Sequence, residues 1–306
     1  MTASLYAGID VGGTAIKWMI VDAAGRIEAQ GRAPTLRRGV AAQSTAIARR
    51  LSDEHPGIAG IGVICPGIVD EAAGRVVYAS NLDLDGAALA EDIGGATGIP
   101  ARLGHDGRAA GIAEGLMGAG RGASSFLMMP IGTGISMAVM LGGRAWAGAS
   151  YCAGEIGHAP VFPDGETCGC GQRGCLEVYA SATGLARRYR DAAGVDVGAR
   201  GVEERLGSDP IADRVWGTGV HALAVSLTQM TLALDPERIV VGGGLSHAGP
   251  RLLDPLRAEL ADMLRWRRPP GLVAAELGDA AGRWGAAVLG ARAAGASCYE
   301  AWEPLR

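Results

Sequence analysis

The sequence has little phenylalanine and no excess or block of positive charge. Among 306 residues only two are phenylalanine, and 28 lysines and arginines face 32 aspartates and glutamates, giving a formal net charge of −4. Proteins that bind nucleic acid usually concentrate positive charge, so this composition argues against nucleic acid as a partner. Glycine is abundant instead, at 50 residues. Without a strict repeat, so much glycine excludes collagen and predicts many tight turns and backbone-lined sites.

The sequence also lacks a basic leader and an unbroken membrane-spanning run. Residues 1–6 carry no basic side chain, and Asp10 interrupts the apolar residues around it. Residues 122–143 contain no charge, but Pro130 and several glycines break this stretch. We therefore expect a buried strand, turn and strand there rather than a membrane helix. The expected location is the cytoplasm, without membrane association.

The six cysteines do not form the framework of a disulfide-rich secreted protein. Cys168, Cys170 and Cys175 fall within eight positions and follow His158, in the pattern H-x9-C-x-C-x4-C. Three thiolates and one imidazole complete a tetrahedral Zn²⁺ site with no open position, so the pattern predicts a structural zinc ion. The alternative is three reduced cysteines in a loop. Small core or half-buried side chains are expected at the other cysteines, Cys65, Cys152 and Cys298.

A strand, a turn of glycine and threonine, and a second strand occur twice along the chain. The first set covers residues 5–10, 12–14 and 15–21, and the second covers residues 126–130, 132–134 and 135–141. Two similar α/β halves that face a cleft explain this repetition most simply. Helical spacing marks residues 40–51, 89–97 and 108–117. Further strands are expected at residues 27–33, 58–63 and 238–241, and residues 192–201 are expected to form a loop.

Both turns have the character of phosphate-binding loops. Asp10 ends a strand beside Gly12, Gly13 and Thr14, whose backbone N–H groups and hydroxyl can approach phosphate oxygens. Asp10 could hold Mg²⁺ directly or through water. The alternative is a tight hairpin with a capping aspartate. The second turn, residues 132–134, is a weaker signal alone, and the glycines at 242–244 are either a nucleotide contact or a simple turn.

Several polar side chains have two possible explanations. If zinc holds one imidazole nitrogen of His158, the other nitrogen is free to meet a hydroxyl, and Glu155 and Glu177 could accept hydrogen bonds from further hydroxyls. Such groups suit a sugar or polyol, although both glutamates could instead be solvated. Asp106 follows an apolar strand and precedes a helix, so it either caps that helix or serves as a general base.

Four motifs together resemble the ROK family of repressors, open-reading-frame proteins and kinases. These motifs are residues 10–14, residues 131–134, Gly-Glu-Ile-Gly-His at 154–158 and Cys-Gly-Cys-Gly-x-x-Gly-Cys-x-Glu at 168–177. The resemblance runs from Tyr6 to about Ser246. It implies an α/β fold of two actin-like, RNase H-like lobes around a central cleft. The small lobe is expected over residues 1–115, completed by a C-terminal helix near 290–306. The large lobe is expected over residues 116–289, with a zinc-binding loop at 150–177.

The resemblance further implies an ATP-dependent kinase that phosphorylates the 6-hydroxyl of a hexose and forms a homodimer. Asp106 would be the catalytic base. The implied sugar-binding residues are Gly67, Asn81, His105, Asp106, Glu155, His158 and Glu177. The implied residues for ATP and Mg²⁺ are Asp10, Gly12, Gly13, Thr14, Lys17, Thr133, Gly134, Gly242 and Gly243. The implied zinc ligands are His158, Cys168, Cys170 and Cys175.

One segment departs from the family pattern. Kinases of the family usually read Asn-Asp-Ala-Asn around the base, and this chain reads His-Asp-Gly-Arg from His105 to Arg108. The first asparagine normally meets sugar hydroxyls around C3 and C4. Either glucose binds in a reshaped pocket, or the preferred sugar is modified there. An example is 3-amino-3-deoxyglucose (kanosamine), which would imply a role in antibiotic biosynthesis.

Other members of the family remain as alternatives. A C7-cyclitol or N-acetylhexosamine kinase would use the same machinery, and polyphosphate could replace ATP as the donor. Retention of Asp10, Thr14 and Asp106 argues against a sugar sensor without enzymatic activity. Because the first phosphate motif begins near residue 1, we expect no DNA-reading domain and hence no repressor.

Overall fold

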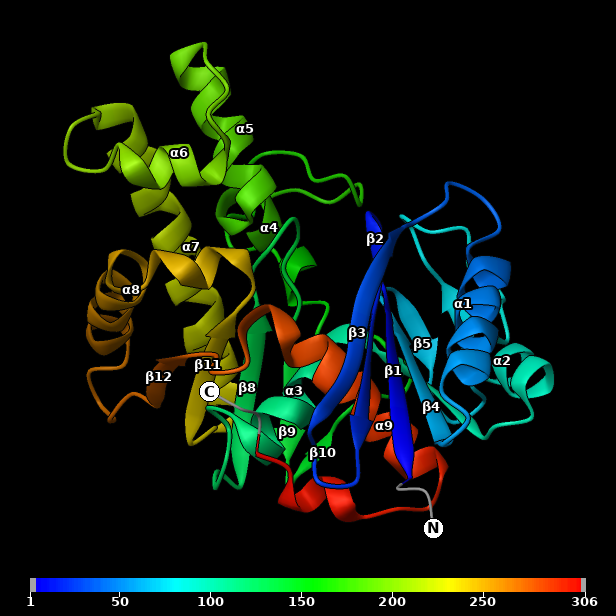
Figure 1. The fold of residues 1–306 in the computed structure, drawn as a ribbon. Coiled ribbons are helices and arrows are strands. Elements are labelled where there is room, and N and C mark those ends of the chain that lie inside the picture. The colour runs from blue at the N-terminus through cyan, green and yellow to red at the C-terminus, as the bar shows by residue number, and fades with distance from the viewer. Residues whose placement is uncertain (1–3, 304–306) are drawn as a thin grey trace. The chain divides into compact units, whose positions relative to one another are not determined.

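The computed structural model describes residues 4–303, which form two compact units (Figure 1). The first unit contains the chain up to Arg121, the short segment Ala147–Cys152 and the chain from Ala280 onward. The second contains Gly122–Trp146 and Ala153–Asp279. Each unit has a five-stranded sheet with helices packed on it, so the expected α/β class is confirmed.

The sheet of the first unit has the strand order β3-β2-β1-β4-β7. β1 (Leu5–Val11), β2 (Ala15–Asp22) and β3 (Ile27–Pro34) pair antiparallel, whereas β4 (Ile58–Cys65) and β7 (Ala101–His105) run parallel to β1. Two helices that contact each other share their apolar core with this sheet: α1 (Val40–Glu54) and α2 (Leu89–Thr97). The hairpin of β5 (Ile68–Asp70) and β6 (Arg75–Tyr78) follows β4.

The last α-helix of the described residues, α9 (Ala281–Ala293), packs on β1 and β4 and on α3 (Asp106–Met117). The approach is very close, because a methyl group at Gly62 of β4 would lie 1.9 Å from the carbonyl oxygen of Ala286. Only glycine fits at such a contact. Strands from the start of the chain therefore depend on a helix from its end.

The sheet of the second unit has the order β10-β9-β8-β11-β12. Its strands are β8 (Ser125–Pro130), β9 (Ala138–Leu141), β10 (Arg144–Ala145), β11 (Arg238–Gly242) and β12 (Gly271–Ala274), with β11 parallel to both β8 and β12. Its α-helices are α4 (Leu176–Ala180), α5 (Ala182–Ala193), α6 (Gly198–Glu204), α7 (Pro210–Leu234) and α8 (Pro250–Met263). Asp209 caps α7 by accepting a 2.8 Å hydrogen bond from the Ile211 N–H.

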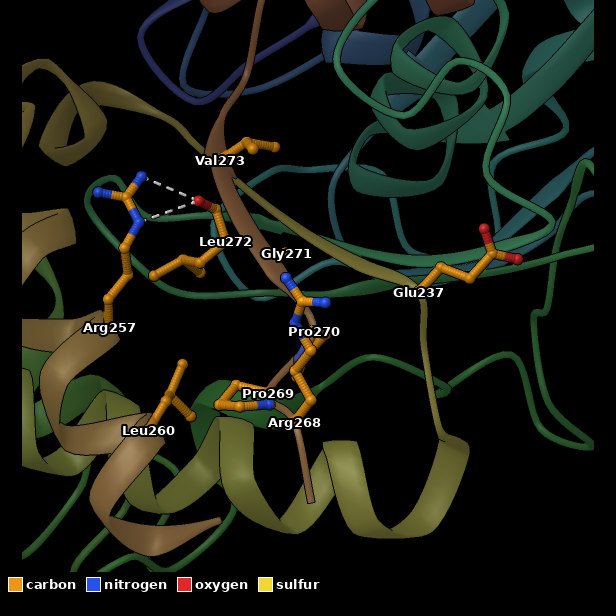
Figure 2. A pocket seen from close by; sticks show the side chains of 9 residues that line it. All are labelled: Glu237, Arg257, Leu260, Arg268, Pro269, Pro270, Gly271, Leu272 and Val273. Carbon is orange, nitrogen blue, oxygen red and sulfur yellow. Dashed lines mark hydrogen bonds between the residues drawn. The ribbon is translucent and has the colours of Figure 1, made fainter. Parts of the chain in front are cut away.

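The edge strand β12 borders a hollow of about 620 Å³, shown in Figure 2. Arg257 of α8 reaches over it and donates two hydrogen bonds to the Leu272 carbonyl oxygen, at 3.3 and 2.9 Å. Pro269 and Pro270 precede the strand. Arg257 thus occupies a backbone carbonyl of this edge strand, and proline and charge at an edge are common protections against pairing with other chains. None of the predicted site residues lines this hollow.

Two local expectations need correction. Residues 192–201 do not form only a loop, because α6 begins at Gly198 and buries Val202 in the core of its unit. The second strand of the second hairpin begins at Ala138 rather than at residue 135, because the N–H groups of Ile135 and Met137 bond to Glu177 and to Gly154 instead. Over the described residues 4–303, no helix has the length and apolar character needed to cross a membrane.

Candidate active site

Three adjacent parallel strands of the first unit end at the same edge of the sheet. Asp10 of β1 lies opposite Ile64 of β4, and Cys65 of β4 lies opposite His105 of β7. The residues that end these strands or follow them are therefore neighbours. This register brings Asp10, Gly67 and Asp106 to one edge, as required if they belong to a common site.

The turn between β1 and β2 has an exposed backbone at its tip. It is closed by a hydrogen bond of 3.1 Å from the Gly12 N–H to the Ala15 carbonyl, and the Thr35 hydroxyl donates to the Gly12 carbonyl at 2.6 Å. Gly13 and Thr14 are exposed. Lys17 lies opposite Asp10 in the β1–β2 ladder. The turn thus exposes backbone and the Thr14 side chain, and the Lys17 ammonium group interacts with the Asp10 carboxylate.

The Asp10 carboxyl has an unusual acidity. Burial, and to a smaller extent the negative charge of Asp106, raises its pKa to about 6 against the opposing effect of Lys17 and Arg283. The neighbouring carboxylates of Asp10 and Asp106 form an acidic cluster, in which a divalent cation would favour the charged form of Asp10.

Replacing Asp10 by asparagine should therefore stabilise the protein at alkaline pH. Because the pKa of Asp10 is higher in the folded protein than in the unfolded chain, its contribution to stability depends on pH. This contribution is fully present below the unfolded-chain pKa of about 3.9 and is lost as the pH rises through the folded-state pKa of about 6. At pH 8 the ionised carboxylate costs about 2–3 kcal/mol. We expect Asp10→Asn to unfold at higher urea than the natural protein at pH 8, without nucleotide or divalent cations, and this difference to shrink towards pH 4.5.

The exposed acid Asp53 of α1 provides the control, because Asp53→Asn should leave both urea midpoints nearly unchanged. An Asp10→Asn protein that is less stable than the natural protein at pH 8 would contradict the assigned electrostatics.

The start of α3 holds the predicted base. The N-cap is His105, whose Nδ1 accepts from the Arg108 N–H at 3.3 Å, so the alternative in which Asp106 caps this helix is wrong. Asp106 is the first residue of the helix, and its Oδ1 accepts from the Gly107 N–H at 2.6 Å. Its side chain is 40% exposed, whereas that of His105 is 6% exposed. Because histidine serves as the cap, the Asp106 carboxylate is accessible to a ligand.

The other two predicted residues of this unit lie on the connections after β4 and β6. Gly67 is half-buried, and Asn81 is exposed in the turn that follows β6. The hairpin β5–β6 separates them, and Ile68 pairs with Tyr78. Gly67 thus lies two residues after the end of β4, whereas Asn81 lies beyond the hairpin, three residues after the end of β6.

In the second unit, the ends of β8 and β11 bring the two predicted nucleotide segments together. The Ile131 N–H donates to the Gly242 carbonyl at 2.9 Å, and the Leu245 N–H donates to the Ile131 carbonyl at 3.0 Å. Thr133 is exposed at the tip of the turn, and Gly243 is half-buried. Segments more than 100 positions apart in sequence therefore form one backbone-rich surface.

The backbone of the Gly-Glu-Ile-Gly-His segment packs on residues 135–137, which follow the turn of residues 132–134. Gly154 has φ +100°, and a methyl group there would lie 1.8 Å from the Met137 carbonyl oxygen, so no other residue fits. Glu177 Oε2 accepts from the Ile135 N–H at 2.9 Å. Glu155 and His158 are half-buried nearby in sequence. Glu177 therefore holds the turn of residues 132–134 in place, a contact that the sequence did not indicate.

The predicted metal ligands meet in space. The ligand atoms of His158, Cys168, Cys170 and Cys175 all lie within 4.8 Å of one another. Cys168 Sγ is 3.7 Å from His158 Nδ1, and Cys170 Sγ is 3.7 Å from Cys175 Sγ. Ligand atoms about 2.0–2.3 Å from a tetrahedral zinc ion lie roughly 3.3–3.8 Å apart. The four residues thus fit a tetrahedral metal ion in donor type and spacing, with Nδ1 as the histidine donor.

A cavity of about 450 Å³ lies beside Thr133. Helix α5 forms one wall with Thr183, Arg187 and Arg190, and Asp196 lies on the loop before α6. Both arginines are paired with acids: Arg187 with Glu166 at 2.5 Å, and Arg190 with Asp191 at 3.3 Å. Apart from Thr133, none of the lining residues was singled out from the sequence, because they become neighbours only through α5 and α6.

One further cluster near Asp106 was not predicted. Arg108, which the sequence showed only as a departure from a pattern, is 1% exposed and forms an ion pair with Glu71 at 2.8 Å. The sequence signal that could have indicated its burial was a charged residue followed by small and apolar residues in a helical segment. Nothing in the sequence connected it to Glu71, which lies 37 positions away.

Comparison with known proteins identifies the family. The model of the ROK family matches residues 6–293. The glucokinase of Halalkalibacterium halodurans is 33% identical over 281 residues, covering 84% of this chain and 85% of that protein. An N-acetylgalactosamine kinase of Shewanella sp. is 32% identical, covering 97% of this chain and 100% of that protein.

A solved structure supports the same assignment. The ROK family glucokinase of Streptomyces griseus, in complex with glucose and AMPPNP, is 29% identical with a TM-score of 0.82, covering 94% of this chain and 100% of that chain. This similarity confirms the predicted actin-like α/β fold. The protein belongs to the ROK family.

Proposed function

We propose that this protein is an ATP- and Mg²⁺-dependent kinase that transfers the γ-phosphoryl group to the 6-hydroxyl of a hexose. The observation that carries the proposal is Asp106, an accessible carboxylate at the start of α3, beside Asp10 and the Gly12–Thr14 turn. Phosphoryl transfer mainly needs alignment of groups and neutralisation of charge, with one carboxylate to receive the proton of the attacking hydroxyl.

In this mechanism Asp106 accepts the proton of the 6-hydroxyl as the sugar oxygen attacks the γ-phosphorus. The bond from that phosphorus to the bridging oxygen breaks, and ADP leaves. Asp10 binds the Mg²⁺ of the MgATP substrate directly or through water. The backbone of Gly12, Gly13 and Thr14 and the turn at Thr133 and Gly134 bind phosphate oxygens, and Gly242 and Gly243 approach the adenosine.

The metal loop positions sugar-binding groups. A zinc ion held by His158 Nδ1 and the three cysteines would supply rigidity rather than chemistry, because four protein ligands leave no open position. Nε2 of His158 is then the nitrogen that donates to a sugar hydroxyl, and Glu155 accepts from another. Glu177 has one oxygen engaged by the Ile135 N–H and offers the other to the sugar.

The cavity beside Thr133 supports a nucleotide as the phosphoryl donor. Its two arginines are neutralised by Glu166, Asp191 and Asp196, so it is not an open cationic channel of the kind that would attract a long polyanion. A cavity of about 450 Å³ that combines α5 side chains with a carboxylate suits a base and ribose. We therefore favour ATP over polyphosphate.

The acceptor sugar differs among members of the family. Similar proteins include glucokinases and an N-acetylgalactosamine kinase, so the family machinery accepts different hexoses. His105 replaces a residue that meets C3 and C4 hydroxyls in the family, and we propose glucose or a glucose modified at C3, such as 3-amino-3-deoxyglucose. N-acetylhexosamines and C7-cyclitols are the alternative acceptors.

The direct test is ADP release by the purified protein with MgATP and matched concentration series of glucose, 3-amino-3-deoxyglucose, N-acetylglucosamine and a C7-cyclitol. We expect turnover with glucose or the amino sugar, and the phosphate on O6 by NMR of the product. The sugar with the higher kcat/KM then identifies the acceptor. A polar mismatch at a pocket wall is worth roughly 1–3 kcal/mol, so a preference of 5- to 150-fold is expected.

Two controls make the result decisive. Replacing ATP by polyphosphate should reduce the rate strongly, and 6-deoxyglucose should give no phosphorylated product. Absence of ADP release with all four acceptors would contradict the proposed function, and product phosphorylated at another hydroxyl would overturn the assigned position.

A further inference from the structure

A buried guanidinium group lies two residues after the proposed base. The side chain of Arg108 is 1% exposed, although most of α3 around it consists of alanine, glycine and isoleucine. A buried charge is costly unless it is paired and hydrogen-bonded. All three nitrogens of this guanidinium group have partners, so the site is built around it.

The three partners come from two segments of the first unit, one at residues 69–71 and the other at Tyr151. Nε donates to Glu71 Oε1 at 2.8 Å, Nη2 donates to the Val69 carbonyl of β5 at 3.1 Å, and Nη1 donates to the Tyr151 carbonyl at 3.2 Å. One planar group thus joins the start of α3, the segment after β4 and the segment Ala147–Cys152. Lysine could not reproduce this fork, because an ammonium group on a flexible stem cannot hold three acceptors in one plane.

The same cluster holds the residues on both sides of Asp106. Glu71 Oε1 also accepts from the His105 N–H at 3.0 Å, so a single carboxylate oxygen connects Arg108 to the residue before the base. The Arg108 N–H donates to His105 Nδ1 at 3.3 Å. Residue 105 is therefore fixed through its backbone and its ring, and Asp106 lies between two anchored residues.

The segment at Tyr151 is held in a conformation that needs support. Tyr151 has φ +62°, which is unusual for a residue with a side chain. Its hydroxyl hydrogen-bonds to Asp70, which raises the pKa of the tyrosine, and its carbonyl accepts from Arg108. Both contacts tie this short segment to β5 and its flank.

We propose that Arg108 is a positioning residue that sets the orientation of Asp106 and His105 by fastening α3 to Glu71, Val69 and Tyr151. The proposal rests on the proposed function, in which Asp106 receives the proton of the sugar hydroxyl. Arg108 itself does not touch the substrate. Its loss should affect the chemical step more than binding of the nucleotide, because the misplaced group is the base.

The first experiment needs no catalytic activity. Hydrogen–deuterium exchange is measured on the natural protein and on Arg108→Lys, in the absence of substrates. We expect faster exchange in the variant at the peptides covering residues 67–71, 104–108 and 148–152, and unchanged exchange in β3 (Ile27–Pro34). Unchanged exchange in all three segments, or an increase spread over the whole chain, would overturn the anchoring role.

The second experiment is kinetic. Arg108→Ala should lower kcat by about 100-fold, the order expected for a small misplacement of a reacting group, with less than a threefold change in KM for ATP. Methylguanidinium added to this variant should raise its kcat at least tenfold, because it can occupy the space left by the arginine side chain. The control is Arg26→Ala, which breaks an ion pair with Asp22 at the turn before β3 and should leave kcat unchanged.

The outcomes separate the two proposals. A natural protein without kinase activity that still shows the exchange pattern contradicts the proposed function and leaves the anchoring intact. An active natural protein whose folded Arg108→Ala variant keeps its kcat, or loses it without recovery by methylguanidinium, contradicts the positioning role. If Arg108→Ala does not fold, Arg108→Lys provides the same kcat comparison.

Discussion

Asp106→Asn is expected to lower kcat by about 10²–10⁴-fold, because an amide cannot receive the proton of the attacking hydroxyl. The amide has nearly the same shape, and its oxygen can still accept the short hydrogen bond from the Gly107 N–H. The start of α3 should therefore persist, and the thermal unfolding temperature should change little. The measurement is ADP release at saturating sugar and MgATP, together with thermal unfolding of both proteins.

Asp53→Asn is the matched control, because it removes an exposed aspartate at the end of α1, outside the predicted site. A folded Asp106→Asn enzyme with near-natural kcat would remove Asp106 from the role of base. A large rise in KM for the sugar with unchanged kcat would instead assign Asp106 to binding alone.

Cys175→Ser should remove the metal and destabilise the second unit. Cys175 is fully buried, and its sulfur lies 3.7 Å from Cys170 Sγ within the four-ligand group. Structural zinc contributes directly to folding, and loss of one thiolate weakens the site by far more than one ordinary hydrogen bond. We expect about one zinc ion per natural chain and far less in the variant, by elemental analysis after extensive dialysis, with a clearly lower unfolding temperature.

Cys298→Ser serves as the control, since Cys298 is half-buried in the 3-10 helix at Cys298–Ala301 and far along the chain from the metal group. It should retain full zinc content. A natural protein without bound metal after purification under reducing conditions, and with unfolding unaffected by a strong chelator, would contradict the metal assignment.

The local signals in the sequence predicted much of the fold. Both repeated strand–turn–strand units are present, and the helix expected at residues 89–97 matches α2. These elements depend on glycine turns and on apolar spacing within a short window, which sequence reading captures. The family motifs then placed the remaining residues in an actin-like fold, which the similarity to solved structures confirms.

The interpretations that failed depend on contacts between distant residues. Helix α6 contains two glycines, at 198 and 201, and is held by packing of Val202 rather than by propensity. Strand β9 starts late because Glu177, 42 positions away, takes the N–H of Ile135. The cap of α3 is an imidazole instead of the carboxylate beside it, because Glu71 and Arg108 fix His105.

The position of α9 has a consequence for synthesis of the protein. All residues proposed to bind sugar, nucleotide or metal lie before Ala280, yet α9, which covers β1 and β4, begins only at Ala281. While the ribosome is still making the second unit, the glycine-lined face of the first sheet has no partner. A message truncated after residue 279 would encode every proposed binding residue and still yield an unfinished first unit. We therefore expect the first unit to complete its folding only after the whole second unit has been synthesised.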